Sequence, residues 1–284
     1  MNREPVLACS VRACGEPLVR EGQSWGCPRG HAFDLARSGY LNLLQPQDRR
    51  SSRAGDTPAA LAARGRLGAA GIGRRLDDEI LRGIRGLGLR ERAVLLELGS
   101  GTGALLARLQ RELGLETFGI DLSRPAIEHA ARNLPGPTWI VANADRRLPI
   151  RPGAVDLVLS IHGRRNPAEC ARVLRSCGRL LVAVPAADDL LELRAAVQGA
   201  GLERDRVLAL LAELEQAFVL LERCTVRERR VLARAELLDL LVATYRGARA
   251  GAEMRVAALS ELALTFASEL LLFAPRSAVG SAPA

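Results

Sequence analysis

The part of the chain after residue 90 alternates between short apolar runs and segments in which apolar residues recur every three or four positions. Short apolar runs bounded by turn residues are typical of buried parallel strands, and the wider spacing is typical of helices with one buried face. The alternation therefore predicts repeated β-α-β units. The expected strands cover residues 93–98, 116–121, 138–143, 154–161 and 178–185, and the expected helices cover 102–113, 124–134 and 166–174.

Further elements are expected on both sides of this repeat. Asp56 or Thr57 is suited to cap the start of a helix, because a short polar side chain can accept from the first free N–H groups. The whole pattern predicts an α/β fold with a doubly wound, Rossmann-like, mostly parallel sheet. The remaining expected elements are helices at 56–66, 74–85 and 234–243 and strands near 217–227 and 262–274.

The first 45 residues lack this alternation, and the segment 45–55 is a polar, arginine-rich connector with proline and glycine near its ends. A chain of 284 residues with 48% hydrophobic content can form one large core and a small appendage, and this composition argues against disorder. The expected divisions are a small module at 1–45, a linker with helices at 46–90, the sheet domain at 91–276 and a flexible tail at 277–284.

Three cysteines and a histidine in the N-terminal module have the spacing of a zinc site. Cys9, Cys14, Cys27 and His31 are separated by four, twelve and three residues. Each close pair can hold the metal from a short knuckle, while the long interval returns as a hairpin. A closed set of four ligands leaves no open position, so this zinc is expected to be structural. The alternative is a group of ordinary buried thiols beside a surface histidine.

A glycine-rich segment, ELGSGTG, lies where the first expected strand of the sheet turns into a helix. Gly99, Gly101 and Gly103 allow the backbone to approach a ligand closely, and the helix start offers free N–H groups. The spacing is GxGxG and not the GxGxxG of dinucleotide sites, which favours S-adenosylmethionine over NAD. Glu97 at the end of the strand belongs to the same expected cofactor site.

Acidic and amide side chains at the ends of the next two strands extend the expected cofactor site. Asp121 ends the second strand, where a carboxylate can accept both ribose hydroxyls; alternatively, it caps the helix that begins near Arg124. Asn143 and Asp145 follow the third strand and can hydrogen-bond an adenine amine, or they close a turn.

The charge of the chain fits an anionic partner. The formal net charge is +8 and the pI is near 10.0, and every one of the 40 basic residues is an arginine, which can bind phosphate in bidentate fashion. This excess of positive charge favours RNA as a partner but also fits a soluble surface. Aromatic residues make up only 3%, so any contact with RNA is expected to be mainly electrostatic.

Three segments together resemble one known family: HAFDLARSGYLNLL directly after the cysteine cluster, GDTPAALAARGRLGAAG at 55–71, and ELGSGTG at 97–103. The chain resembles the bacterial 23S ribosomal RNA (guanine-N1)-methyltransferases from Cys14 to about Pro275. It departs from them in two places. The first cysteine pair has a CxxxxC spacing where the family usually has CxxC, and residues 160–165 replace a segment that usually carries an aromatic residue and a proline.

This resemblance implies an S-adenosylmethionine-dependent methyltransferase that methylates N1 of a guanine in 23S ribosomal RNA. It implies that the zinc module takes part in RNA recognition and that Asp145 is the adenine partner, and by analogy it allows a homodimer. The altered segment leaves open a small-molecule or antibiotic-pathway substrate. A third reading is an RNA-binding protein that has lost catalysis.

The altered segment also supplies the catalytic candidate. His162 follows the fourth strand at the carboxyl edge of the sheet, where open α/β folds bind ligands, and can act as a general base on guanine N1 or orient the base. Arg164 and Arg165 can hold a phosphate, or they form the solvated start of the helix at Asn166.

The chain is expected to act in the cytoplasm, without a membrane. MNREPVLACS lacks an apolar run typical of a cleaved signal, and no segment has the length and apolar character of a span. In that compartment Cys170, Cys177 and Cys224 are expected to be free thiols.

Overall fold

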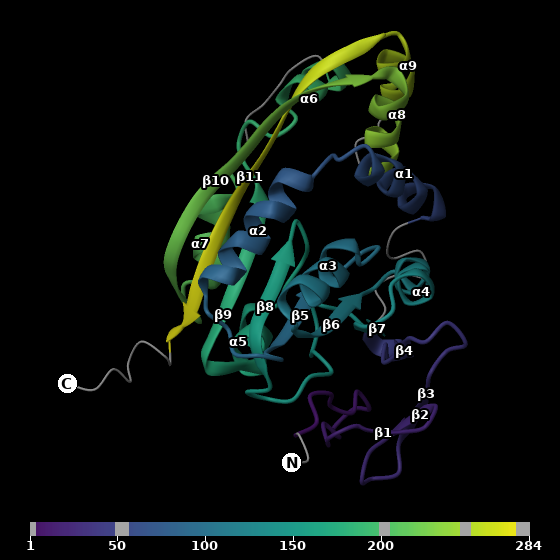
Figure 1. Cartoon of the computed structure of the whole chain (residues 1–284), viewed down its shortest axis with the longest axis vertical. Helices are drawn as coiled ribbons and strands as arrows, with labels where there is room; N and C mark the ends of the chain where they lie inside the picture. Colours follow the sequence, from purple (N-terminus) through teal and green to yellow (C-terminus); the bar gives the residue numbers. More distant parts are fainter. Residues whose placement is uncertain (1–3, 49–56, 199–204, 245–250, 277–284) are drawn as a thin grey trace, which may run out of the picture.

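A computed structural model describes residues 4–48, 57–198, 205–244 and 251–276, which form a twisted central sheet with helices on both faces (Figure 1). The sheet has eight strands in the order β10-β11-β9-β8-β5-β6-β7-β4. The six strands from β4 to β9 are parallel to one another, as expected for a doubly wound sheet. β11 runs antiparallel to β9, and the edge strand β10 runs antiparallel to β11. The strands are β4 (Leu41–Asn42), β5 (Val94–Leu98), β6 (Glu116–Asp121), β7 (Thr138–Val141), β8 (Val155–Ile161), β9 (Leu174–Pro185), β10 (Phe218–Ala233) and β11 (Glu261–Pro275).

Helices cover both faces of the sheet because each has one apolar side. α2 (Arg74–Gly86), α3 (Ala104–Leu113) and α4 (Arg124–Asn133) bury leucine and isoleucine against one face, in a cluster that includes Trp139. α5 (Pro167–Val173) and α7 (Val207–Leu214) pack on the opposite face. The chain order reverses at β5, so the carboxyl ends of β5 and β8 form the switch point at which such sheets bind ligands.

Two strands are longer than the sequence pattern predicts. β9 begins at Leu174, four residues before the expected start, and β10 continues to Ala233 although the expected strand ended at 227. The second half of β10 contains the run RERR, which lacks the apolar character of a buried strand. It forms a strand because it is the edge of the sheet, where one side of the backbone pairs with β11 and the side chains face solvent.

The ends of β10 and β11 extend beyond the other strands and carry a second cluster of helices, which we call the cap (Figure 1). The cap has its own apolar core, separate from the two that line the sheet. Thr57 accepts a hydrogen bond from the N–H of Ala60, which makes Thr57 the N-cap of the first cap helix and confirms one of the two expected caps. The cap helices are α1 (Pro58–Ala69), α6 (Leu191–Gln198), α8 (Arg234–Ala243) and α9 (Ala252–Ala257); α6 and α9 were not expected from the sequence.

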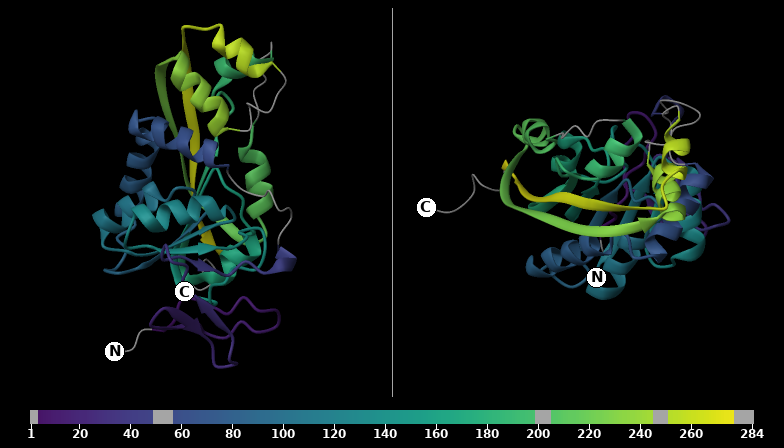
Figure 2. Two further views of the ribbon diagram at one scale, coloured as in Figure 1. Left: turned by 90° about the vertical axis from the view of Figure 1, so that its right-hand side faces the viewer. Right: turned by 90° about the horizontal axis from the view of Figure 1, so that it is seen from above.

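The N-terminal module lies at the opposite end of the molecule and packs directly on the sheet domain (Figure 2). Its three-stranded sheet contains the expected hairpin between the cysteine pairs. Leu7 and Leu18 are fully buried in the same cluster as the sheet, and the N–H of Ala8 donates to the carbonyl of Pro149. The module's chain then supplies β4 as an edge strand of the main sheet, followed by a short 3-10 turn, η1. Its elements are β1 (Val19–Glu21), β2 (Ser24–Gly26), β3 (Ala32–Asp34) and η1 (Pro46–Asp48).

Within the described ranges, none of the helices is long and apolar enough to cross a membrane. The tail expected at 277–284 lies outside the described residues.

Candidate functional site

The four predicted metal ligands meet at one point in the N-terminal module. Their ligand atoms all lie within 4.8 Å of one another. The first knuckle is closed by the N–H of Cys14 donating to the carbonyl of Val11 at 3.0 Å, and the second by the N–H of Gly30 donating to the carbonyl of Cys27 at 2.9 Å. Two short turns therefore aim the four side chains inward, as the spacing predicts.

The distances between these ligand atoms match a tetrahedral zinc site. Sγ of Cys9 and Sγ of Cys27 each lie 3.5 Å from Nδ1 of His31, and the two sulfur atoms of Cys14 and Cys27 are 3.9 Å apart. Zinc bonds of about 2.3 Å to sulfur and about 2.0 Å to nitrogen place such pairs about 3.5 Å and about 3.8 Å apart in a tetrahedron. The wider first knuckle thus still delivers its ligands, and Nδ1 is the histidine atom that faces the metal position.

The acidity of Cys9 does not distinguish a zinc ligand from an ordinary buried thiol. Burial is the main cause that raises the pKa of the Cys9 thiol to about 12, and burial raises the pKa of the core cysteine Cys170 to a similar value. The convergence of the four ligand atoms, at distances that fit a tetrahedron, is what favours zinc.

The glycine loop lies at the switch point of the sheet, between β5 and α3. Gly99, Gly101 and Gly103 all have positive φ, at 74°, 54° and 77°. At Gly103 a Cβ would lie 2.2 Å from the ring of Trp139, so this glycine is required by packing in the protein itself. At Gly101 nothing lies within 4 Å of the added Cβ, so the loop is open at that residue. An added Cβ at Gly99 would make only an ordinary contact with Gly163, so packing blocks a side chain at Gly103 alone of these three glycines.

Asp121 braces this loop. One carboxylate oxygen accepts from the N–H of Gly101 at 2.8 Å, and the other accepts from the N–H of Ser123 at 2.7 Å. Ser123 is the N-cap of α4, with its hydroxyl accepting from the N–H of Ala126. The alternative role of Asp121 as the helix cap is therefore taken by Ser123, and Asp121 stands at the carboxyl end of β6 beside the open loop.

Glu97 is the second carboxylate at the loop and is only 4% exposed. Its Oε2 and the hydroxyl of Ser100 are buried without a hydrogen-bond partner among the described residues. Burial, and then the nearby charges of Asp77 and Asp121, raises the pKa of Glu97 well above its usual value. Unpartnered buried acceptors are unfavourable, and a ligand with cationic and hydroxyl groups would satisfy them. The buried oxygens of Glu97 and Ser100 therefore fit S-adenosylmethionine, which carries an ammonium, a sulfonium and two ribose hydroxyls.

Asn143 and Asp145 have different surroundings although they are adjacent to the same strand end. The amide of Asn143 donates to the carbonyl of Asp48 at 2.8 Å, and its oxygen accepts from the N–H of Asp145 at 2.9 Å. Asn143 thus connects η1 to the end of β7. Of the two roles expected for this residue, it closes a turn. The carboxylate of Asp145 pairs with the guanidinium of Arg164 at 3.2 Å and remains the candidate for an adenine amine.

His162 lies at the carboxyl end of β8 and has a left-handed backbone, with φ of 51°. Its Nε2 is 2.9 Å from the hydroxyl of Ser268 on β11. The residue as a whole is exposed, and its contact with Ser268 is partly buried. Loss of hydration, and then the positive charge of Arg206, lowers the pKa of His162 to about 4. His162 is therefore neutral at neutral pH and is held in one orientation.

The two arginines after His162 separate into different roles. The side chain of Arg165 is only 8% exposed and donates to Glu213 of α7 at 3.2 Å and to the carbonyl of Gly163 at 3.1 Å. Arg165 therefore fastens α7 to the end of β8 and is neither a surface phosphate ligand nor a solvated helix start. Arg164 is 75% exposed, and its contact with Asp145 connects the end of β8 to the end of β7, on the two sides of the glycine loop.

Sequence reasoning missed several residues of this site. Ser268 lies 106 positions from His162 and within an apolar strand, so no local pattern connects the two. Trp139, whose ring occupies the space beside Gly103, falls inside an expected strand, and its contact with the loop has no local sequence signal. Ser100 was present in the glycine motif, and its burial without a partner is visible only in the folded chain.

Comparisons with known proteins agree with both parts of the site. The zinc-ribbon family described as RlmA, N-terminal, matches residues 8–52, and a methyltransferase domain family matches residues 95–183. The 23S rRNA (guanine(748)-N(1))-methyltransferase of Streptomyces fradiae is 37% identical over 208 residues, which are 72% of this chain and 72% of that protein. A relative from Micromonospora griseorubida, also named for guanine N1 of 23S rRNA, is 33% identical over 95% of this chain and 98% of its own.

Proposed function

This chain belongs to the 23S rRNA (guanine-N1)-methyltransferase family, and we propose that it transfers the methyl group of S-adenosylmethionine to N1 of a guanine in 23S rRNA. The observation that supports this proposal best is that the similarity spans both the cysteine-histidine cluster and the glycine loop. The similarity therefore includes the N-terminal module as well as the methyltransferase domain.

The residues at the switch point bind and orient the reactants. Bound S-adenosylmethionine supplies an electrophilic methyl group on a sulfonium, from which a neutral thioether is a good leaving group. Glu97 and Asp121 provide carboxylates where the cofactor's ammonium and ribose hydroxyls are expected, and Gly101 leaves the space for them. The protein's main contribution is then alignment of guanine N1 with the methyl group and exclusion of water.

We propose that His162 positions the guanine and receives a hydrogen bond from it. N1 of guanine carries a proton that must leave when the N1–methyl bond forms, and this proton passes to solvent. With a pKa of about 4, His162 is a weak proton acceptor, so orientation of the base through the ring nitrogen that is not engaged by Ser268 fits better than removal of the proton.

The RNA substrate also suggests where and with what the protein acts. We propose that it works in the cytoplasm, where ribosomal RNA is made and assembled in bacteria. A homodimer remains a proposal by analogy and would double the basic surface offered to RNA.

The first experiment is to incubate zinc-loaded protein and methyl-labelled S-adenosylmethionine with unmodified 23S rRNA and to identify the labelled nucleoside by mass spectrometry. Label in 1-methylguanosine is expected. Mapping the labelled nucleotide then shows whether it is guanine 748, the position in the name of the Streptomyces fradiae relative. Absence of label in RNA, with a preparation that binds the cofactor, would overturn the proposal in favour of a small-molecule substrate and would direct attention to residues 160–165.

A further inference from the structure

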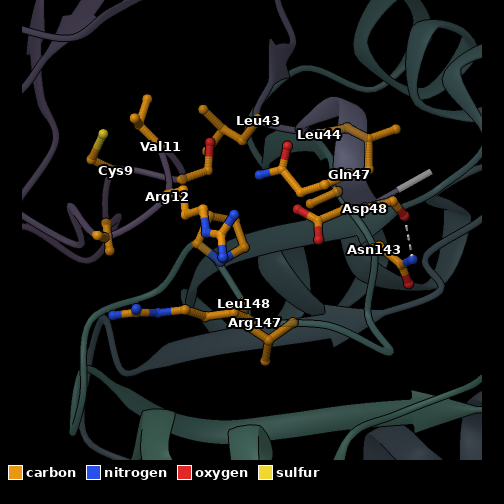
Figure 3. A pocket seen from close by; sticks show the side chains of 15 residues that line it. Cys9, Val11, Arg12, Leu43, Leu44, Gln47, Asp48, Asn143, Arg147 and Leu148 are labelled. Carbon is orange, nitrogen blue, oxygen red and sulfur yellow. Dashed lines mark hydrogen bonds between the residues drawn. The ribbon is translucent and has the colours of Figure 1, made fainter.

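A crevice lies between the N-terminal module and the strand end that borders the cofactor site (Figure 3). One wall is the first zinc knuckle, residues 9–14, and the other is the end of β7 with the loop that follows it. Its volume is about 220 Å³, which is large enough for a nucleobase. We call this space the knuckle crevice. It is distinct from the glycine loop, whose residues do not line it.

Positive charge reaches the knuckle crevice from both walls. Arg12 is one of the residues that widen the first knuckle, and Arg147 belongs to the loop after β7. Neither has an acidic partner within the described part of the chain, and both are exposed. Arg147 reaches across to the knuckle, because a Cβ at Gly15 would lie 2.8 Å from its guanidinium. Arg29 of the second knuckle, which does not line the crevice, donates to the carbonyl of Ala13 at 3.0 Å and places a third cation beside the first knuckle.

The walls of the knuckle crevice are tied together by hydrogen bonds. The amide of Gln45 donates to the hydroxyl of Ser10 at 2.9 Å, and the amide of Asn143 donates to the carbonyl of Asp48 at 2.8 Å. The zinc fixes the knuckle from the other side. The crevice is thus preformed, which lowers the entropy that a ligand loses on binding.

The lining suits the two parts of a nucleotide. Val11 and Leu44 are the partly exposed apolar side chains of the lining that a base can contact, and the buried Leu43 and Leu148 support them from below. In Figure 3 the side chain of Arg147 runs toward the zinc module at one end, whereas the carboxylate of Asp48 points into the crevice, away from Asn143, which binds the backbone carbonyl of Asp48. A phosphate is repelled by Asp48 and attracted to the arginine end. The carboxylate instead accepts N–H groups from the edge of a base.

We propose that the knuckle crevice binds one nucleotide of the RNA substrate, with its phosphate on Arg12 and Arg147 and the polar edge of its base toward Asp48. This inference rests on the proposed function, because it takes RNA as the substrate. The nucleotide is not the methylated one: the crevice borders β7, whereas His162 follows β8 on the other side of β5. The RNA therefore spans the cofactor site, held on one side in the crevice and on the other at the strand end that carries His162.

The test compares Arg12→Gln and Arg147→Gln with Arg20→Gln, a matched control in β1 that is exposed and does not line the crevice. Binding to a fluorescently labelled 23S rRNA fragment is measured at several salt concentrations, together with zinc content and cofactor affinity. Each crevice variant is expected to bind RNA about tenfold more weakly and to lower the slope of log K against log salt by about 0.7–0.9. The control is expected to match the wild type, and all three variants are expected to keep zinc and cofactor binding.

Crevice variants that bind RNA with wild-type affinity and salt slope would overturn the inference. Asp48→Asn tests the orientation separately: weaker binding is expected if the carboxylate accepts from a base, and tighter binding would show that it faces a phosphate, contrary to the proposal. The proposed function fails on its own if wild-type protein forms no 1-methylguanosine. If wild type methylates the RNA and the crevice variants bind normally, only the crevice is wrong.

Discussion

Gly101 and Gly103 belong to the same motif, but a side chain is excluded by packing only at Gly103. At Gly103 the space for a side chain is occupied by Trp139, whereas at Gly101 it is open toward the expected cofactor. Both have positive φ, so both alanine variants carry backbone strain of about 1 kcal/mol or more. The sequence motif alone does not distinguish these positions.

We expect Gly103→Ala to destabilise the protein by more than Gly101→Ala, because overpacking adds about 1–3 kcal/mol to the strain. Gly101→Ala is expected to keep most of the stability and to lose cofactor affinity by at least tenfold. Denaturant unfolding and calorimetric titration with S-adenosylmethionine measure the two effects. Equal losses of stability, with cofactor affinity unchanged at Gly101, would contradict the assignment.

His162 gives the protein a pH-dependent stability with a defined sign. Its pKa is about 4 in the folded protein and near 6.5 when unfolded. Between these values the unfolded state binds more protons, so this residue's contribution to stability is complete above about pH 6.5 and is lost as the pH falls toward 4.

We therefore expect His162→Gln to lose less stability than wild type when the pH is lowered from 7.5 to 5. Urea unfolding at the two pH values measures this difference. Asp77, whose pKa is raised by burial to about 6, titrates in both proteins and cancels in the comparison. An identical pH dependence in the two proteins would show that His162 keeps an ordinary pKa.

At the scale of elements, the cap is the part of the fold whose apolar core is separate from the sheet domain. β10 and β11 extend past β9, and the cap helices bury their apolar faces on this extension and on one another. Leu237 of α8 is fully buried there, whereas Val242 of the same helix is 48% exposed. The cap core is therefore a separate source of stability.

We expect Leu237→Ala to destabilise the protein by about 2–5 kcal/mol, because it leaves a cavity in a closed core. Val242→Ala, the matched control in the same helix, should change the free energy of unfolding by no more than about 0.5 kcal/mol. Chemical denaturation with a fluorescence readout measures both. A loss of similar size in the two variants would mean that α8 is not packed as described.

At the scale of the whole molecule, a short series of hydrogen bonds connects the zinc site with the border of the expected cofactor site. From the zinc knuckle, Ser10 contacts Gln45, η1 follows in sequence, and Asp48 binds Asn143 at the border of the cofactor site. The N-terminal module is therefore held against the sheet domain and is not a loosely attached appendage.

We expect Cys27→Ser to release zinc and abolish RNA methylation while cofactor binding by the sheet is retained. Zinc analysis, the 1-methylguanosine assay and cofactor titration measure the three properties. Cys177→Ser, which replaces an exposed free cysteine, is the matched control and should be normal in all three. RNA methylation by zinc-free Cys27→Ser would refute this division of roles.

Much of the fold follows from local pattern. The zinc ligands, the five central strands and the helices between them are set by spacing and periodicity, which depend on residues close in sequence. The expected cofactor loop is predicted for the same reason, because its glycines and Glu97 lie within seven consecutive residues.

Only the tertiary structure decided how distant residues meet. It placed Ser268 against His162, Asp48 against Asn143, and Arg165 under α7 in place of a phosphate. It also made RERR a strand and turned the zinc module into a wall of a crevice. These outcomes depend on contacts between segments far apart in the chain, and such contacts are determined by the packing of whole elements. A single sequence records the preferences of each element but not the partner against which it packs.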